Sequence, residues 1–433
     1  MRFYRDGMLD DRSVLEPRTD ARIRLNSAGF PVLAGGVGRS AYFIGDTPSP
    51  YAVRGSDYRL WDETGREYID ANGNFTTLIH GNAHPAIVEA AERAIRTGAS
   101  WGIPNEDEWE LAELLIRRLP GLGQVRFTNS GTEAVMAAIR IARSITGRDS
   151  LIMTKDGYHG SSDAALSTSG PARGIPRAVS DAVSLVPVND IEKLRATFAA
   201  NPDGYAAIIL DLLPNKAGLI ALDPEFVAEA RALATAHGTL LIIDEVISIR
   251  LGVGGRSGEY GIVPDLLTTG KLIGGGFAVG AVAGRDEFMN YLAPTHPDEI
   301  GLSGTFSGNP VAMAAGAVAV RMLDAAAIER LNALGDAARL EASARVASVG
   351  WEFRGSGSLM RAFPQGERKV SATLQQKLWW QTQSRGVIVS SANLVSLSTP
   401  MTGDVVRDLT DRLVDAVIAT ATDAPATEPM KGL

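Results

Sequence analysis

Short apolar runs alternate with helix-periodic segments between Gln124 and Gly284. The predicted strands are the seven runs 124–129, 150–155, 182–190, 206–213, 239–246, 265–270 and 278–284. Between them, segments such as 131–147, 191–202 and 224–238 have the apolar period of helices. Apolar runs of this length, joined by helical crossovers, predict a mainly parallel sheet that is covered on both faces. The predicted fold class is therefore α/β, with a large domain built on seven strands.

The segments on either side of this region follow a different pattern. Residues 51–70 alternate apolar and polar positions around turn signals, which predicts a short antiparallel sheet. Beyond a long helix that starts near Asn309, the runs 353–364 and 385–400 predict strands of a smaller α+β domain. The predicted boundaries are 1–75 and 323–420 for the small domain, 76–322 for the large domain, and 421–433 for a flexible tail.

Composition narrows the range of functions open to this chain of 433 residues. A net charge of −8 argues against nucleic acid or an anionic membrane as a general partner. Because cysteine is absent and the histidines have no metal-ligand spacing, we expect no disulfide, no thiolate chemistry and no metal site. The N-terminal segment is charged and no apolar run has membrane length, so we expect a cytoplasmic protein.

Two charged residues stand at the ends of apolar runs, Asp244 and Lys271. A buried carboxylate is costly unless it is paired, and a protonated pyridine nitrogen would be such a partner. A lysine among apolar and glycine residues has a lowered pKa and is therefore nucleophilic. The chain has only seven lysines, which makes this one conspicuous. Each residue taken alone also fits a cap in an ordinary turn.

Two further segments follow predicted strands. Ser130, Gly131 and Thr132 lie where a strand runs into a helix, and their N–H groups and hydroxyls suit an anion. A helix cap without any ligand would use the same residues. Tyr158 can lay its ring on a flat cofactor, with His159 supporting the loop by hydrogen bonding. An ordinary loop with a Tyr-His pair fits that segment as well.

The stretches FTNSGTEA, DGYHG, LIIDEV, PDLLTTGKLIGGG, SGTFSGNPVAMAAG and GSGSLM together resemble the class III, fold-type I aminotransferases that use pyridoxal phosphate. The resemblance covers nearly the whole chain and points to the glutamate-1-semialdehyde aminomutase group, nearest to its β-amino-acid (β-phenylalanine) aminotransferases. It implies a fold-type I architecture and a homodimer with shared active sites. It also implies that Lys271 forms the Schiff base, that Asp244 pairs with the pyridine nitrogen, and that Tyr158 and Val246 lie on opposite faces of the ring.

The same resemblance supplies the candidate site residues. Catalytic roles fall to Lys271, Asp244 and Tyr158. The candidate cofactor-binding residues are Ser130, Gly131, Thr132, Tyr158, His159, Asp211, Asn215, Asp244, Val246, Lys271 and Thr305, the last reaching over from the partner subunit. The candidate substrate-binding residues are Arg39, Tyr42 and Trp101.

Two features of the sequence bear on the substrate. Arg39 in GVGRSAYF matches the arginine that binds the substrate carboxylate in the β-phenylalanine branch, and Arg250 in DEVISIRLG is similar to the same branch. Where the family usually has Glu-Pro-Val after the fourth strand, this chain has Asp211 to Asn215. We expect that difference to reshape the site near the cofactor.

The expected activity is transfer of an amino group between an amino acid, by resemblance a β-amino acid, and a keto acid such as 2-oxoglutarate. Lys271 would carry the proton from the amine-bearing carbon to the cofactor. One alternative is an aminomutase, which isomerises a single molecule and needs no acceptor. The other is a non-catalytic binding protein with the same fold, against which the joint presence of Lys271, Asp244 and Tyr158 argues.

Overall fold

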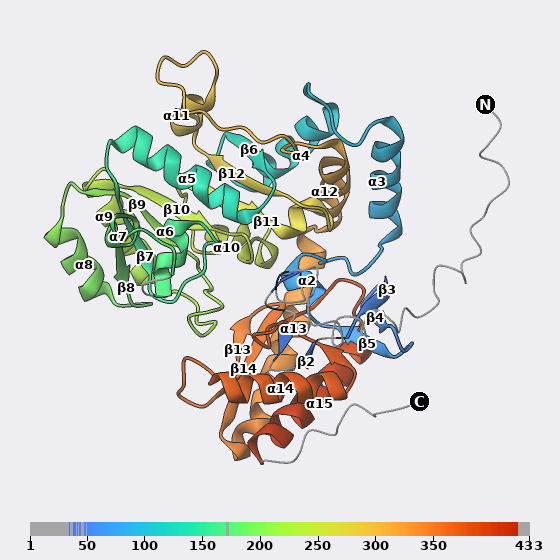
Figure 1. Ribbon diagram of the computed structural model, residues 1–433. Coiled ribbons are helices and arrows are strands. Elements are labelled where there is room, and N and C mark those ends of the chain that lie inside the picture. Colours follow the sequence, from blue (N-terminus) through green and yellow to red (C-terminus); the bar gives the residue numbers. More distant parts are fainter. Residues whose placement is uncertain are drawn as a thin grey trace, which may run out of the picture.

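The computed structural model describes residues 50–169 and 173–422, and before residue 50 only residues 34, 38–39, 41, 43–44 and 47–48. Figure 1 shows two lobes. The larger lobe carries the central sheet, and the smaller lobe combines elements from both ends of the chain, drawn in blue and in orange to red. Tyr42 lies outside the described residues. The predicted domain boundaries stay a prediction.

Seven strands form the central sheet, in the order β6-β12-β11-β10-β9-β7-β8. They are β6 (Gln124–Thr128), β7 (Ser150–Thr154), β8 (Val183–Val186), β9 (Tyr205–Leu210), β10 (Leu240–Asp244), β11 (Leu266–Gly270) and β12 (Gly280–Gly284). Only β12 runs antiparallel to its neighbours, and the remaining adjacent pairs are parallel. The predicted α/β fold with a seven-stranded, mainly parallel sheet is confirmed.

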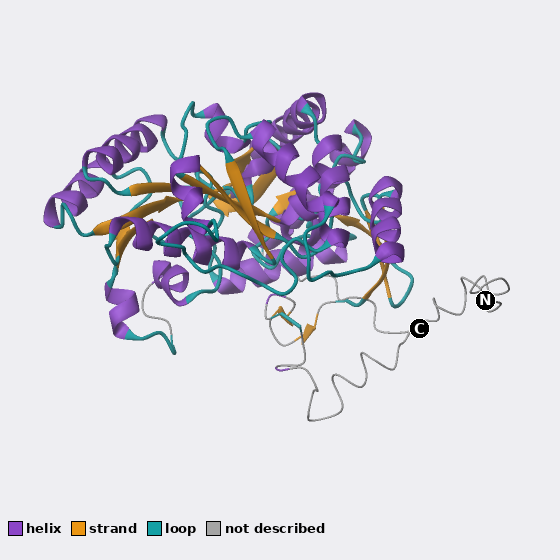
Figure 2. Cartoon of the chain, turned by 90° about the horizontal axis from the view of Figure 1, so that it is seen from above, coloured by secondary structure: helices purple, strands orange, loops and turns teal. Residues whose placement is uncertain are grey.

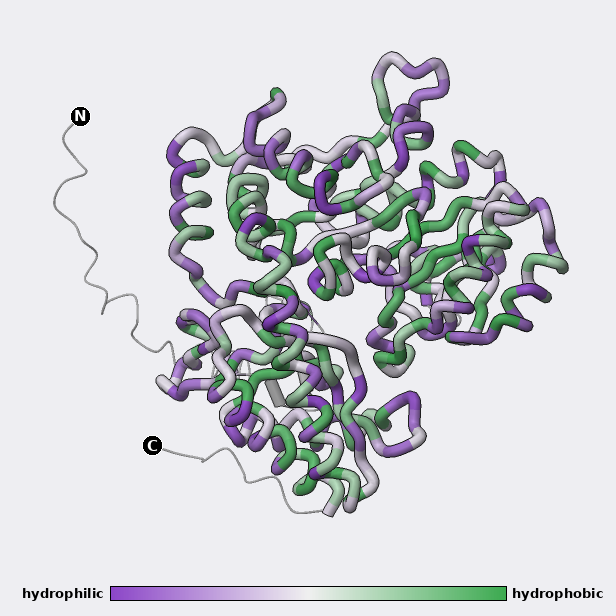
Figure 3. The backbone as a smooth tube through the Cα atoms, turned by 180° about the vertical axis from the view of Figure 1, so that it is seen from behind, coloured by the Kyte–Doolittle hydropathy of each residue, from purple (hydrophilic) through white to green (hydrophobic). Residues whose placement is uncertain are grey.

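Helices cover the central sheet on both sides, as Figure 2 shows from above. On one face α5 (Gly131–Thr146) packs against β9, β11 and β12, and on another side lie α8 (Ile191–Ala200) and α9 (Pro224–Ala236). Strands β9 and β10 are almost entirely apolar. Figure 3 draws hydrophobic stretches of the backbone in green, and several of them pass through the interior of the larger lobe. Every residue of β9, β10, β11 and β12 is buried, as expected for strands covered on both faces.

The long helix expected near Asn309 is two helices. The first, α12 (Pro310–Met322), starts with Asn309 as its N-cap, whose side chain accepts a hydrogen bond from the backbone N–H of Ala312. The second, α13 (Ala325–Val346), starts anew because the side chain of Asp324 caps it. Among the described residues no single helix is long and apolar enough to span a membrane. Only this pair, bent by 72°, reaches that length and apolar character when its two helices are counted together.

The smaller lobe contains three short sheets. Strands β3 (Ala52–Ser56), β4 (Arg59–Asp62) and β5 (Glu67–Asp70) form the predicted antiparallel sheet, and β15 (Val387–Ile388) joins it beside β5. Strands β13 (Trp351–Ser356) and β14 (Leu359–Pro364) form a hairpin that continues into β16 (Val395–Ser396). Strands β1 (Phe43–Ile44) and β2 (Thr47–Pro48) form the third sheet. Because β15 pairs with β5, the N- and C-terminal parts of the chain share one sheet.

The remaining helices are distributed over both lobes. They are α2 (Gly73–Thr76), α3 (Pro85–Thr97), α4 (Glu106–Arg118), α6 (Asp163–Leu166), α7 (Arg177–Asp181), α10 (Gly255–Glu259), α11 (Asp286–Met289), α14 (Ala372–Ser384) and α15 (Gly403–Ala421).

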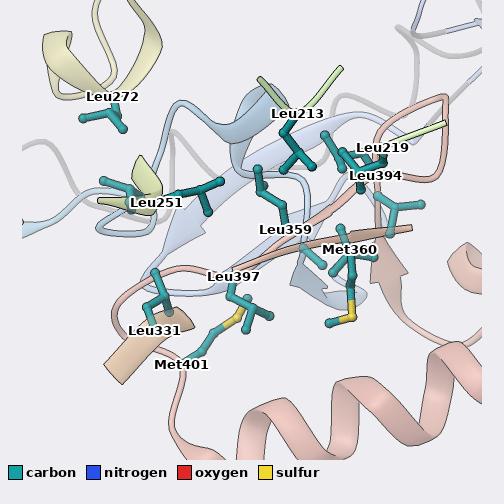
Figure 4. Close-up of a cluster of buried hydrophobic side chains, with 14 of the residues drawn as sticks. Leu213, Leu219, Leu251, Leu272, Leu331, Leu359, Met360, Leu394, Leu397 and Met401 are labelled. Carbon is teal, nitrogen blue, oxygen red and sulfur yellow. The ribbon is translucent and has the colours of Figure 1, made fainter. Parts of the chain in front are cut away.

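One hydrophobic core runs through both lobes. Figure 4 shows a part of it, in which Leu251 and Leu272 of the larger lobe lie in one cluster with Leu359 and Leu397 of the smaller lobe. Beside this core the fully buried Arg250 donates hydrogen bonds to the hydroxyls of Ser358 and Ser396 and to the carbonyl of Leu397. This arginine therefore ties the segment after β10 to the smaller lobe.

Candidate active site

The carboxyl ends of five parallel strands bring most of the predicted site residues to one edge of the central sheet. Strand β6 is followed by Ser130, β7 by Tyr158, β9 by Asp211 and β11 by Lys271, while Asp244 ends β10. Ligands of doubly wound sheets bind at this edge, because the loops there diverge and leave backbone and side-chain groups exposed. The candidate active site lies at this edge.

Asp244 is buried, and both of its carboxylate oxygens are held. Oδ1 accepts hydrogen bonds from the backbone N–H of Val246 and the hydroxyl of Thr268, both at 3.1 Å. Oδ2 lies 2.8 Å from Nδ1 of His159. A carboxylate only accepts, so His159 donates from Nδ1. Nε2 of His159 is buried and has no hydrogen-bond partner in the described part of the chain.

The neighbouring acid, Glu245, has a different environment. It is fully buried and accepts hydrogen bonds from the hydroxyl of Ser248 and from the backbone N–H groups of Arg256 and Ser257. These contacts hold the start of α10 against the end of β10. Of the acid pair, only Asp244 is therefore directed toward the candidate site.

Lys271 follows β11 directly, and its backbone is in the left-handed region with φ of 53°. This conformation is unfavourable for a residue with a side chain, and such residues concentrate at functional sites. Burial lowers the pKa of the Lys271 amine, while the charges of Asp244 and Asp211 oppose that shift. A lowered pKa increases the neutral, nucleophilic fraction of the amine near neutral pH.

Ser130, Gly131 and Thr132 form the start of α5. The hydroxyl of Ser130 accepts the backbone N–H of Glu133 as an N-cap, which leaves the first N–H groups of the helix for a ligand. A Cβ on Gly131 would lie 2.9 Å from both methyl carbons of Val246, so glycine permits this close approach. The hydroxyl of Thr132 accepts the backbone N–H of Ser161, which fixes the Tyr158 loop beside the helix start.

Tyr158 presents its ring at this edge, and 43% of the residue is exposed. The Nζ atom of Lys216 lies 4.3 Å from the ring centroid. Lys216 is not among the site residues predicted from the sequence. Its only signals were the scarcity of lysine and its position directly after Asn215.

Asp211 is buried at the end of β9, and its Oδ1 accepts the backbone N–H of Leu213. Burial and the charge of Asp244 raise the pKa of the Asp211 carboxyl to about 7. The side-chain oxygen of Asn215 is buried without a partner among the described residues, and its backbone carbonyl accepts from Arg361 at 3.3 Å. Asp211 and Asn215 thus belong to the same edge as Asp244.

The remaining candidates lie on three other segments of the chain. Arg39 donates to the side chain of Asn74 at 3.0 Å and lies over the ring of Phe75, beside a cavity of about 510 Å³ in the smaller lobe. Trp101 is exposed between α3 and α4. Thr305 is exposed in the turn before α12. Ser307 of the same turn accepts a hydrogen bond from the side chain of Asn129 at 3.4 Å.

The residues at the sheet edge fit a flat pyridine ring that carries a phosphate and an aldehyde. The helix start offers N–H donors to the phosphate, and the buried carboxylate of Asp244 suits a protonated ring nitrogen. The amine of Lys271 is the nucleophile that an aldehyde requires. Among the described residues no group of three or more His, Cys, Asp or Glu side chains could hold a metal ion.

The chain is similar to known proteins over nearly its whole length. The model of the class III aminotransferase family matches residues 45–417. An omega-transaminase from Sphaerobacter thermophilus is 36% identical, with a TM-score of 0.88, over 93% of this chain and 97% of that one. A transaminase solved with pyridoxal phosphate bound is 32% identical, with a TM-score of 0.88, over 97% of this chain and 100% of that one. A β-phenylalanine aminotransferase from Variovorax paradoxus is 31% identical, with a TM-score of 0.83, over 97% of this chain and 99% of that one.

Proposed function

The chain belongs to the class III aminotransferase family, and we propose that it moves an amino group from a β-amino acid to a keto acid such as 2-oxoglutarate. Its cofactor is pyridoxal 5′-phosphate. One observation carries the assignment of the site. Asp244 ends β10 in register with Thr268 of β11, and Lys271 follows three residues after Thr268, directly beyond the end of β11. An acid and an amine thus lie at two adjacent strand ends, near enough for the charge of Asp244 to act on the pKa of Lys271.

Each element of the site would hold a different part of the cofactor. When bound, the cofactor would supply a conjugated ring that takes up negative charge from a carbon that has lost its proton. Asp244, fixed by His159 and Thr268, would keep the ring nitrogen protonated. The N–H groups of Gly131 and Thr132 would bind the phosphate, and Tyr158 would stack on the ring.

Lys271 would carry out the proton transfer. Its amine would hold the cofactor, and the amine of the substrate would take that place. The freed amine of Lys271 would then accept the proton from the amine-bearing carbon of the substrate and give it back later in the turnover. Burial lowers the pKa of Lys271, so that a larger fraction of this amine is neutral near physiological pH and able to accept a proton.

Arg39 supports the assignment of a β-amino acid as donor. In a β-amino acid the carboxylate lies one carbon further from the amine than in an α-amino acid, so its cation must lie further from Lys271. The motif GVGRSAYF and the likeness to the β-phenylalanine aminotransferase both favour Arg39. Arg39→Ala should raise KM for the amino acid while the affinity for the cofactor is retained. An unchanged KM would exclude Arg39 from substrate binding.

A homodimer with shared sites is part of the proposal. Trp109 on α4 and Phe306 are 74% and 62% exposed. They lie on adjacent segments, because the side chain of Asn105 donates to the carbonyl of Gly308 at 2.9 Å. Exposed apolar side chains gathered in this way suit an interface with a second copy. Such an interface would bring Thr305 of the partner subunit to the phosphate. The cytoplasmic location stays a prediction.

A panel of α-, β- and ω-amines, each paired with 2-oxoglutarate or pyruvate, tests the function. Formation of the keto product and of the new amino acid is followed by chromatography. We expect turnover with β-amino acids that requires an acceptor and is abolished in Lys271→Ala. Isomerisation of a single amino compound without acceptor would instead identify an aminomutase. Covalent capture of the cofactor by borohydride in the wild type, but not in Lys271→Ala, checks the lysine independently of turnover.

A further inference from the structure

Lys216 brings a second amine to the candidate active site. Its Nζ lies 4.3 Å from the centroid of the Tyr158 ring. A cation at this distance is attracted by the ring quadrupole, which directs the long lysine side chain toward the site. The Tyr158 ring is partly exposed, so the amine stands where an incoming molecule can reach it.

The charge of Lys216 is not neutralised by a carboxylate in the described part of the chain. Burial lowers the pKa of Lys216, and no acidic neighbour opposes that effect. The acid on the same loop, Asp211, is turned inward to the backbone N–H of Leu213, and its pKa is raised to about 7. It therefore supplies at most a partial negative charge near neutral pH.

Cations of the smaller lobe support the same loop from the other side. Arg361 donates to the carbonyl of Asn215, the residue before Lys216, and its Nε is buried without a partner among the described residues. The guanidinium group of Arg361 lies 4.8 Å from the centroid of the Phe363 ring. Arg354 lies over the same ring, but its charge is paired with Glu352 at 3.0 Å. Arg361 therefore adds to the positive charge of Lys216 near this loop, which favours an anion there.

We propose that Lys216 binds a second carboxylate of the amino acceptor, so that the site prefers a dicarboxylic keto acid to a monocarboxylic one. This inference rests on the proposed function, since it assigns an acceptor to the same site. A dicarboxylic keto acid has a carboxylate beside the reacting carbon and another at its far end. The ammonium of Lys216 can leave the Tyr158 ring and donate up to three hydrogen bonds to the distal carboxylate.

The kinetic test compares 2-oxoglutarate with pyruvate as acceptor for one common amino donor. In Lys216→Met, which keeps the length and removes the charge, the ratio of kcat/KM for 2-oxoglutarate to that for pyruvate should fall about 10- to 100-fold. Lys216→Arg should retain most of that ratio. The control is Lys193→Met, an exposed lysine on α8 at which the same substitution should leave the ratio unchanged. Equal losses for both acceptors, or an unchanged ratio in Lys216→Met, would overturn the proposal.

A binding measurement separates this inference from the proposed function. Calorimetric titration of the cofactor-loaded enzyme with glutarate and with butyrate should show weaker glutarate binding in Lys216→Met and similar butyrate binding. If the wild type transaminates no donor, the proposed function fails, and glutarate binding still decides the role of Lys216. If Lys216→Met is poorly folded, Lys216→Gln replaces it in the titration. If Lys216→Gln binds neither glutarate nor butyrate, Lys216 is only a structural partner of Tyr158 and the proposal fails.

Discussion

Nδ1 of His159 lies 2.8 Å from Oδ2 of Asp244, and both side chains are buried at the carboxyl edge of the central sheet. The loop after β7 therefore orients the carboxylate at the end of β10. Since Oδ1 is held by Val246 and Thr268, the carboxylate cannot rotate without breaking hydrogen bonds. We propose that His159 acts on the cofactor through Asp244, as a positioning residue.

His159→Leu should lower kcat and the cofactor affinity by about 10- to 100-fold, because Asp244 loses the donor that orients it. His159→Asn provides the matched control, since its amide can donate from nearly the position of Nδ1. We expect it to keep most of the affinity, as measured by titrating the cofactor-free protein and following absorbance. Equal losses in both variants would show that the ring serves only to fill space.

Asp211 should make the stability of the cofactor-free protein depend on pH. Its pKa is about 7 in the folded chain, against an ordinary value of 3.8, so between about pH 4 and pH 7 the folded state binds more protons than the unfolded state. Its contribution to the free energy of unfolding therefore falls as pH rises through this window. Asp211→Asn should remove this contribution to the pH dependence of the free energy of unfolding. In urea unfolding, the stability of the variant relative to wild type should therefore be higher at pH 8 than at pH 4. Parallel stability curves for the two proteins would contradict the shifted pKa.

Gly131→Ala should destabilise the protein by about 1–3 kcal/mol, because the added Cβ would lie 2.9 Å from the Val246 methyl carbons. It should also weaken cofactor binding by displacing the start of α5. Adding Val246→Ala provides the room, so the double variant should recover part of the lost stability. Thermal unfolding of the wild type, the two single variants and the double variant measures this coupling. If the two changes in stability simply add, the contact between residue 131 and Val246 is not the cause of the destabilisation.

Arg250→Met should destabilise the protein by about 2–5 kcal/mol, because Ser358, Ser396 and the carbonyl of Leu397 lose a buried charged donor. Arg250→Lys keeps the charge and part of the hydrogen bonding, so it should lose less. Equilibrium unfolding in urea gives both values. A loss below 1 kcal/mol in Arg250→Met would mean that this link between the lobes contributes little.

The hydrophobic pattern of the sequence predicts the sheet and the edge at which the candidate site lies. Apolar runs between helix-periodic segments predict a parallel sheet, and the carboxyl ends of parallel strands meet at one edge. Ser130, Tyr158, Asp244 and Lys271 each lie at a strand end or within four residues after it, so local pattern and topology together place them on that edge. The shared motifs also identified the family.

The neighbours of these residues follow from the packing of the folded chain. It separated Asp244, which faces the site, from Glu245, which holds α10. It paired His159 with Asp244, set Lys216 over Tyr158, and buried Arg250 between the lobes. These relationships join segments tens to more than a hundred residues apart. Their geometry depends on how the strands and helices pack against one another, and no local pattern of hydrophobicity encodes it.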